Sequence, residues 1–149
     1  MQKHMNRMTA LALVIAVMLL AACKKTHGTQ DTEHPAEVKK VEGTELSRVT
    51  LSEKAMQRID LKTDLVREQR VSRSASPQKV VPYSSLIYDP QGQCWIYTCP
   101  QPRTFVRHKV EVDYIEGDLA VLKDGPPIGT VIASVGVAEL YGTEFKVGH

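Results

Sequence analysis

The side chains with the most evident chemistry in the second half of the chain are two thiols and an imidazole, those of Cys94, Cys99 and His108. Thiolate and imidazole are ligands that bind soft metals, and two cysteines can also form a disulfide. If residues 94–99 are extended, however, the two cysteine Cα atoms lie roughly 16 Å apart. A disulfide needs about 4.4–6.8 Å. We therefore expect two separate thiols packed as small apolar side chains, with a metal site of Cys94, Cys99 and His108 as the alternative.

Motifs that would carry catalysis are missing from the sequence. It contains no Gly-x-Ser-x-Gly turn, no Walker loop, no HExxH and no GxGxxG. A serine at position 84 or 85 can be combined with His108 and Asp113 into a hydrolase triad on paper, but their spacing does not favour it. We expect a protein that is not an enzyme and needs no cofactor.

The first 22 residues have the organisation of an export signal. Lys3 and Arg7 precede an uninterrupted apolar run over residues 10–20, and small residues follow it. A basic start, a short apolar core and a small-residue cut site define a secretory signal peptide. The run is shorter than the roughly 20 apolar residues that a bilayer-spanning helix needs, so a membrane helix is the weaker interpretation.

The sequence Leu20-Ala21-Ala22-Cys23 resembles the lipobox of bacterial lipoproteins. That resemblance implies cleavage between Ala22 and Cys23 and attachment of lipid to the Cys23 thiol. Each buried acyl CH₂ contributes roughly 0.8 kcal/mol, so two or more chains attach a protein stably to a membrane. We expect a lipid-anchored protein of the bacterial cell envelope that faces the periplasm. The alternative is an ordinary secreted protein.

Charge argues against nucleic acid as a partner. The chain of 149 residues has 19 Lys and Arg and 17 Asp and Glu, and the expected leader contains two of the basic residues. Its removal leaves 17 residues of each sign and a formal charge of zero. Nucleic-acid-binding domains are expected to be strongly basic, with a pI above about 9.

Residues 23–45 are predicted to be a flexible tether. Few of them are apolar, and such a segment cannot bury enough surface to offset the entropy lost on ordering. His27 and His34 lie in this segment. We interpret them as solvated side chains, because no closed set of metal ligands surrounds them.

Residues 46–149 are predicted to form one mainly β domain, a compact antiparallel barrel or roll with one short helix and about six to eight strands. Ser52 is expected to cap a helix over residues 53–58, and residues 89–92 (DPQG) to form a turn. Residues 105–115 alternate in polarity, which predicts one long strand with Arg107 on a solvated face. The other expected elements are strands at 46–51, 59–66, 80–83, 86–88, 94–98, 119–122 and 130–135, an exposed strand or connection at 67–79, and one helical turn at 137–140.

Short motifs occur in a characteristic order along this domain. They are VVPYSSL at 80–86, WIY at 95–97, FVRHKV at 105–110 and DGPPIGTVI at 124–132. This order resembles the C-terminal part of periplasmic adaptors, the membrane fusion proteins of resistance-nodulation-division efflux pumps. Residues 49–52 and 61–63 are similar to the strand, helix and strand that precede the lipoyl and hairpin region of that family. The resemblance implies the membrane-proximal domain, a β-rich roll assembled from both ends of an adaptor chain.

A full adaptor inserts a β-barrel, a lipoyl domain and a helical hairpin where this chain has only residues 67–79. The chain thus resembles the membrane-proximal domain alone, and the resemblance implies docking onto a transporter or full-length adaptor of a heavy-metal or drug efflux system. We predict a non-catalytic, lipid-anchored accessory, with Arg103 and Arg107 as exposed docking contacts. The alternative is a periplasmic metal-binding lipoprotein that uses Cys94, Cys99 and His108; a vestigial adaptor fragment is a third interpretation.

Overall fold

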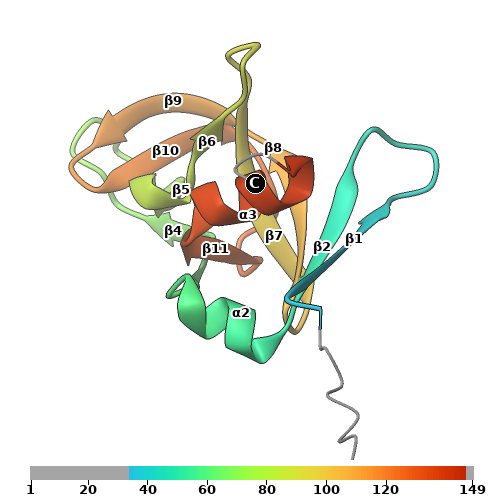
Figure 1. Ribbon diagram of the computed structural model, residues 1–149. Coiled ribbons are helices and arrows are strands. Elements are labelled where there is room, and N and C mark those ends of the chain that lie inside the picture. The colour runs from blue at the N-terminus through green and yellow to red at the C-terminus, as the bar shows by residue number, and fades with distance from the viewer. Residues whose placement is uncertain (1–33, 147–149) are drawn as a thin grey trace, which may run out of the picture. The chain divides into compact units, whose positions relative to one another are not determined.

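The computed structural model describes residues 34–146. Their strands form two antiparallel sheets (Figure 1). The larger sheet has the order β1-β2-β8-β7-β11-β3, with β6 also paired to β7, and the smaller sheet has the order β4-β5-β10-β9. The larger sheet consists of β1 (Ala36–Lys40), β2 (Ser47–Leu51), β3 (Lys62–Leu65), β6 (Ile87–Tyr88), β7 (Cys94–Gln101), β8 (Thr104–Lys109) and β11 (Val131–Val135). The smaller sheet consists of β4 (Arg67–Gln69), β5 (Gln78–Pro82), β9 (Glu111–Glu116) and β10 (Leu119–Asp124).

The predicted mainly β, antiparallel architecture is confirmed, but in this part of the chain neither sheet closes into a barrel. Strands β1 and β3 are the edges of the larger sheet, and β4 and β9 are the edges of the smaller one. Apart from the single strand expected over 105–115, the expected strands are present with shifted ends, and residues 67–79 supply both an exposed strand, β4, and a connection to β5.

Within residues 34–146, the core consists of three clusters: Val71, Val80 and Val121 form a small one on the smaller sheet, and the other two lie on the two faces of the larger sheet. One cluster fills the space between the sheets and includes Ile96 of β7 and Ala120 of β10. The other covers the opposite face and includes Tyr97 of β7 and Leu140 of the C-terminal helix. Strand β7 is therefore buried on both sides, which explains why its sequence is an almost continuous apolar run instead of an alternating one.

The chain passes from one sheet to the other at two buried valines. Val66 separates β3 of the larger sheet from β4 of the smaller one, and Val110 separates β8 from β9 in the same way. Both side chains belong to the cluster between the sheets. The single strand expected over 105–115 is therefore wrong, because burial of Val110 between the sheets redirects the chain there.

Two α-helices occur within residues 34–146: α2 (Glu53–Arg58) and α3 (Val137–Phe145). The Ser52 hydroxyl accepts a hydrogen bond from the Ala55 backbone N–H at 3.1 Å, so the predicted cap of α2 is confirmed. Helix α3 is longer than the single turn that we expected, and its buried face includes Glu144. A short 3₁₀-helix, η2 (Tyr83–Ser85), follows β5.

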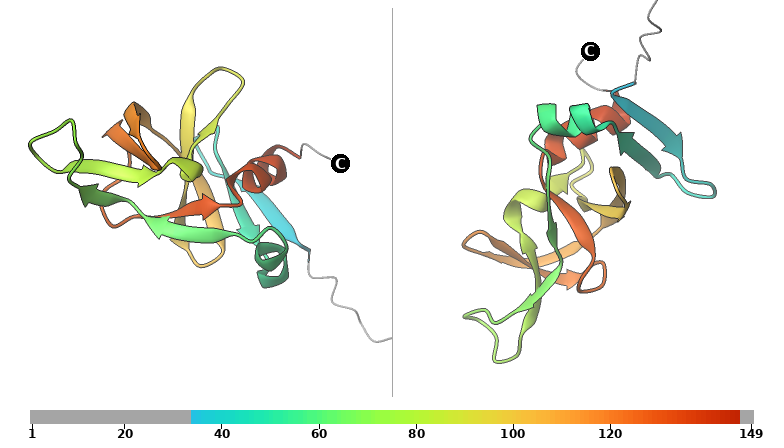
Figure 2. Two further views of the ribbon diagram at one scale, coloured as in Figure 1. Left: turned by 90° about the vertical axis from the view of Figure 1, so that its left-hand side faces the viewer. Right: turned by 90° about the horizontal axis from the view of Figure 1, so that it is seen from below.

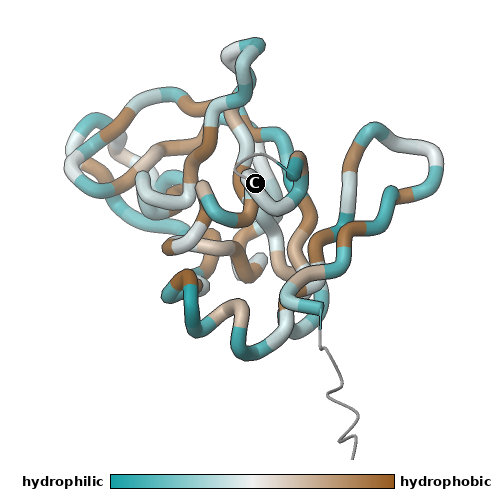
Figure 3. The backbone as a smooth tube through the Cα atoms, viewed as in Figure 1, coloured by the Kyte–Doolittle hydropathy of each residue, from teal (hydrophilic) through white to brown (hydrophobic). Residues whose placement is uncertain are grey.

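Part of the segment expected to be a tether is a strand. Residues Ala36 to Lys40 pair with Leu51 to Ser47 as β1 and β2, and Ala36 and Val38 pack against the cluster that contains Leu140. The boundary predicted at residue 45 was wrong. The alternating apolar residues Ala36 and Val38 are enough to order this segment, because β2 offers partners for its backbone hydrogen bonds. Figure 3 shows that the loop joining β1 to β2 is mostly hydrophilic.

The turn predicted at residues 89–92 is confirmed. The Gly92 N–H donates to the Asp89 carbonyl at 2.9 Å, and Gly92 has a φ of 76°. The Asp89 side chain also accepts from the Gln91 and Gln93 backbone N–H groups at 3.0 and 2.8 Å.

Both views in Figure 2 place the β4–β5 loop at the end of the domain away from α2 and α3.

Candidate functional site

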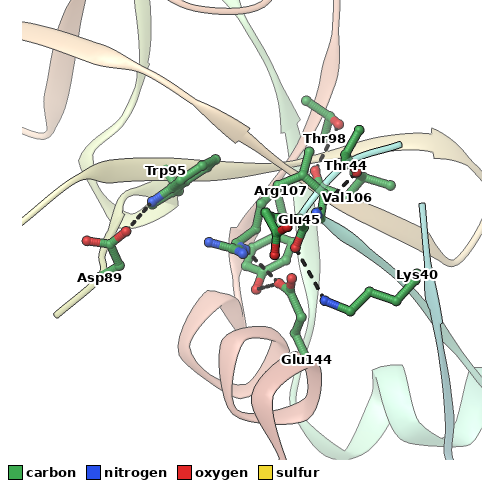
Figure 4. A network of polar contacts seen from close by, with 11 residues as sticks. Lys40, Thr44, Glu45, Asp89, Trp95, Thr98, Val106, Arg107 and Glu144 are labelled. Carbon is green, nitrogen blue, oxygen red and sulfur yellow. Dashed lines mark hydrogen bonds and ion pairs between the residues drawn. The ribbon is translucent and has the colours of Figure 1, made fainter. Parts of the chain in front are cut away.

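A buried ion pair joins α3 to the larger sheet (Figure 4). Arg107 Nε on β8 donates a hydrogen bond to Glu144 Oε2 on α3 at 2.8 Å, and the two side chains are 8% and 1% exposed. The Tyr97 hydroxyl on β7 donates to the same oxygen at 2.7 Å. One carboxylate thus compensates a buried cation and satisfies a buried hydroxyl.

Strand register places these side chains together. Tyr97 and Arg107 are direct partners in the antiparallel β7–β8 pair, so their side chains leave the sheet on the same face. Trp95 lies two residues before Tyr97 and shares that face, because side chains alternate along a strand. Helix α3 packs there through Val137 and Leu140 and brings Glu144 to the pair.

Two aromatic rings enclose the guanidinium group. Arg107 Cζ lies 4.5 Å from the centroid of Trp95 and 4.7 Å from that of Phe145. Cation–π contacts contribute about 0.5–2 kcal/mol, depending on how far the cation is desolvated. Trp95 Nε1 in turn donates to Asp89 Oδ2 at 2.9 Å. The rings therefore offset part of the cost of removing Arg107 from water.

The protonation of the network follows from its surroundings. Burial, and then the hydrogen bond to Glu144, raises the pKa of the Tyr97 hydroxyl, so Tyr97 remains a proton donor at neutral pH. Desolvation acts to raise the pKa of Asp89, but hydrogen bonds from Trp95, Gln93 and Gln91 outweigh it and lower that pKa. Tyr97 is thus neutral and Asp89 ionised around pH 7.

A groove of about 800 Å³ lies between α2 and α3. Ala138 and Gly142 face it from successive turns of α3, opposite Ala55 of α2, and these small residues leave the space between the helices unfilled. Leu51 and Ile59 add apolar surface. Its charged lining residues are Arg58, Glu139 and Lys146.

A smaller hollow of about 160 Å³ adjoins the groove, and Leu51 lines both. Arg103 lines this hollow from the turn between β7 and β8, where it has a φ of 62° and its backbone carbonyl accepts from the Leu51 N–H at 2.9 Å. Arg103 is exposed, as predicted, and its docking role stays a prediction.

The buried network and the groove have different capabilities. Tyr97, Arg107 and Glu144 line neither hollow, and the Arg107 and Glu144 side chains are almost fully enclosed. A substrate therefore has no path through these hollows to their polar atoms. We interpret the network as a structural connection that fixes α3 on the sheet and thereby shapes one wall of the groove.

The expectation that Arg107 is exposed is wrong. Strand β8 was expected to have one solvated face, but α3 covers the face that carries Phe105 and Arg107. The guanidinium group consequently makes its contacts inside the domain. Arg107 thus supports the groove indirectly, by positioning Glu144 and α3, and its side chain is not a surface contact.

The structure does not bring together the three side chains of the alternative metal site. Cys94 belongs to the cluster between the sheets, whereas Cys99 packs against the cluster on the opposite face. Both are free thiols, as predicted, and burial raises the pKa of each. His108 is exposed on β8, and no group of three metal-ligating side chains occurs among residues 34–146. The alternative of a metal site at Cys94, Cys99 and His108 is therefore wrong. Ala22 and Cys23 lie outside the described residues.

Glu144 and the groove were not foreseen. Glu144 continues the helical spacing of Val137 and Leu140, but a carboxylate at such a position is normally read as solvated. The alanines at 55 and 138 carry no chemical signal of their own. Nothing near Arg107 or Glu144 in the sequence signals that the two side chains pair.

Neither models of protein families nor curated proteins match this chain. The helices within residues 34–146 are too short or too polar to cross a bilayer.

Proposed function

We propose that this protein is a non-catalytic accessory of a resistance-nodulation-division efflux system, held at the membrane by lipid on Cys23 and acting by docking onto the transporter or a full-length adaptor. The observation that carries the proposal is the apolar groove between α2 and α3 with cations at its edge. An open groove of this kind suits a protein partner, whereas the buried polar side chains of Tyr97, Arg107 and Glu144 bond to one another.

The pairing of the strands supports the resemblance to an adaptor domain built from two chain segments. Strands β2 and β3 belong to the segment before residue 67, and they pair with β8 and β11 from the segment after residue 79. The motifs that carry the resemblance fall on β5 and η2, on β7, on β8, and on the end of β10 through the start of β11. The short connection thus joins two segments that share one sheet.

The length of chain before the domain supports an action close to the membrane. Eleven residues connect Cys23 to Pro35 at the groove, and at about 3.5 Å each they span at most roughly 40 Å. Tethering within that distance raises the local concentration of the domain around membrane proteins. A modest interface then suffices for occupancy.

Crosslinking in native membranes tests the proposal. Cells that express the full chain are treated with an amine-reactive crosslinker, the protein is purified under denaturing conditions, and its partners are identified by mass spectrometry. We expect a transporter or adaptor subunit of an efflux system, with recovery reduced in a Cys23→Ser variant expressed at the same level. Recovery of neither subunit would overturn the proposal.

The lipid anchor has its own test. Intact-mass analysis of the membrane-extracted protein is expected to show loss of residues 1–22 and a mass increase on Cys23 that corresponds to acyl chains. A retained leader or an unmodified Cys23 would exclude this part of the proposal without affecting the docking surface.

A further inference from the structure

Some charged residues around the groove form ion pairs with neighbouring side chains, and others do not. Arg58 closes the last turn of α2 and Lys146 caps the end of α3, and both line the groove. Neither forms an ion pair within residues 34–146, and Arg103 in the adjoining hollow also has none there. By contrast, Glu37 of the same hollow is paired with Lys39 at 2.8 Å. Glu139, the acidic residue that lines the groove, forms no ion pair within residues 34–146 either. The surface therefore combines an apolar trough with three unpaired positive charges and one unpaired negative charge.

We propose that the groove between α2 and α3 binds an amphipathic segment of a partner protein, whose small apolar side chains enter the trough and whose Asp or Glu residues pair with Arg58 and Lys146. This inference rests on the docking role proposed above and specifies the chemistry of the partner. Apolar anchors in a groove with charged residues at its margin are a recurrent mode of peptide recognition. The margin charges select and orient the segment, and the trough supplies the buried apolar area.

Other occupants fit the groove less well. Residues 24–33 of this chain (KKTHGTQDTE) contain no apolar side chain that could enter the trough. An anionic lipid surface would meet Glu139 in the groove and Glu37 in the adjoining hollow, which reduce the attraction exerted by the cations. A protein segment can instead place acidic side chains only where the cations are.

A photo-crosslinking amino acid at position 138 tests the inference in the full, membrane-anchored chain. Ala138 is exposed and lines the groove, whereas Gln57 of α2 is exposed and does not, so position 57 is the control site. After irradiation of native membranes, the crosslinked peptide is sequenced by mass spectrometry. We expect position 138 to capture a segment of another polypeptide in which acidic residues flank aliphatic or small ones, and position 57 to capture it at least tenfold less.

Charge and shape variants then test the two parts of the surface. With the photo-crosslinker at Thr143, which also lines the groove, Arg58→Gln and Lys146→Gln should each lower the yield about two- to fivefold, the contribution of a partly exposed ion pair. Lys54→Gln removes the same charge from α2 outside the groove and should leave the yield unchanged. Ala55→Leu, on the opposite wall of the groove, should lower it further by filling the trough.

The outcomes separate this inference from the proposed function. Suppose that the amine-reactive reagent recovers an efflux subunit but position 138 gives no crosslink. This result would overturn the inference that the groove binds the partner and would leave the proposed docking role intact. Capture of lipid, of residues 24–33 or of a second copy of this chain at position 138 would also overturn the inference. Equal effects of Arg58→Gln and Lys54→Gln on the crosslinking yield would show that the positive charge of α2 acts without an ion pair at the groove. This result would overturn the proposed pairing with Arg58.

Discussion

Replacing Glu144 with glutamine should destabilise the domain far more than the same change at a surface glutamate. The substitution keeps the size of the side chain but leaves the Arg107 cation uncompensated at a position where its side chain is 8% exposed. Removal of one partner from a buried ion pair typically costs about 3–5 kcal/mol. The Trp95 and Phe145 rings remain in place and offset part of this loss, so we expect a decrease of about 3 kcal/mol in the free energy of unfolding.

The matched control is Glu111→Gln. Glu111 pairs with Lys123 at 2.7 Å, but the two side chains are 57% and 67% exposed, and solvent screens such a pair. Exposed pairs contribute about 0–1 kcal/mol, so the two glutamine substitutions should differ by roughly 2 kcal/mol or more. A second arm combines Glu144→Gln with Arg107→Met. Because the double variant contains no unpaired charge, it should recover part of the stability lost in the single one.

Urea unfolding of the chain from residue 23 onward, with Cys23→Ser in every variant, measures these differences. Comparable slopes with different midpoints would show that stability alone has changed. A loss of about 3 kcal/mol corresponds to a decrease in Tm of roughly 10 °C or more for a domain of this size. If Glu144→Gln and Glu111→Gln lose the same small amount, the Arg107–Glu144 pair is not buried in solution, and the account of how α3 is fixed fails.

Three further substitutions test local features. Ser52→Ala removes the cap of α2 and should cost about 1 kcal/mol in urea unfolding, while a loss under a few tenths would contradict the capping role. Gly136→Ala should destabilise by about 1 kcal/mol or more, because φ is 80° and the added Cβ would lie 3.3 Å from the Ile59 carbonyl oxygen; unchanged stability would refute this. Hydrogen bonds from the Ser72 hydroxyl and backbone N–H lower the pKa of Glu116. The ionised carboxylate therefore stabilises the folded domain at pH values above its unfolded pKa, and this contribution is lost as the pH falls through the lower folded pKa. Ser72→Ala should raise that pKa in an NMR titration, and no change would show that the hydroxyl does not bond in solution.

Features that depend on neighbouring residues could be read from the sequence. Ser52 before an acidic residue predicted both the start and the cap of α2, and the spacing of Asp89 and Gly92 predicted the turn before β7. The extended spacing of Cys94 and Cys99 predicted two separate thiols, and the two side chains pack in clusters on opposite faces of the larger sheet. In each case the physical cause lies within a few residues of its effect.

Features that depend on distant residues could not be read in this way. The alternation around Arg107 was interpreted as one solvated face, because nothing near it in the sequence announces that α3 will cover that face. Burial of Glu144 requires a cation from another element, so its position looked solvated. The groove arises from the meeting of α2 with α3, and small side chains such as Ala138 gain significance only once that packing is known.

The crossings at Val66 and Val110 have a consequence for how the domain unfolds. Each valine lies in the same interior cluster, and the backbone on either side of it belongs to a different ladder of hydrogen bonds. Opening the hydrogen-bond ladder of one sheet therefore displaces residues that are packed against the other sheet, so the two sheets should unfold as one cooperative unit. Amide protons in β7 and β10 should then exchange with deuterium at rates governed by the same global opening.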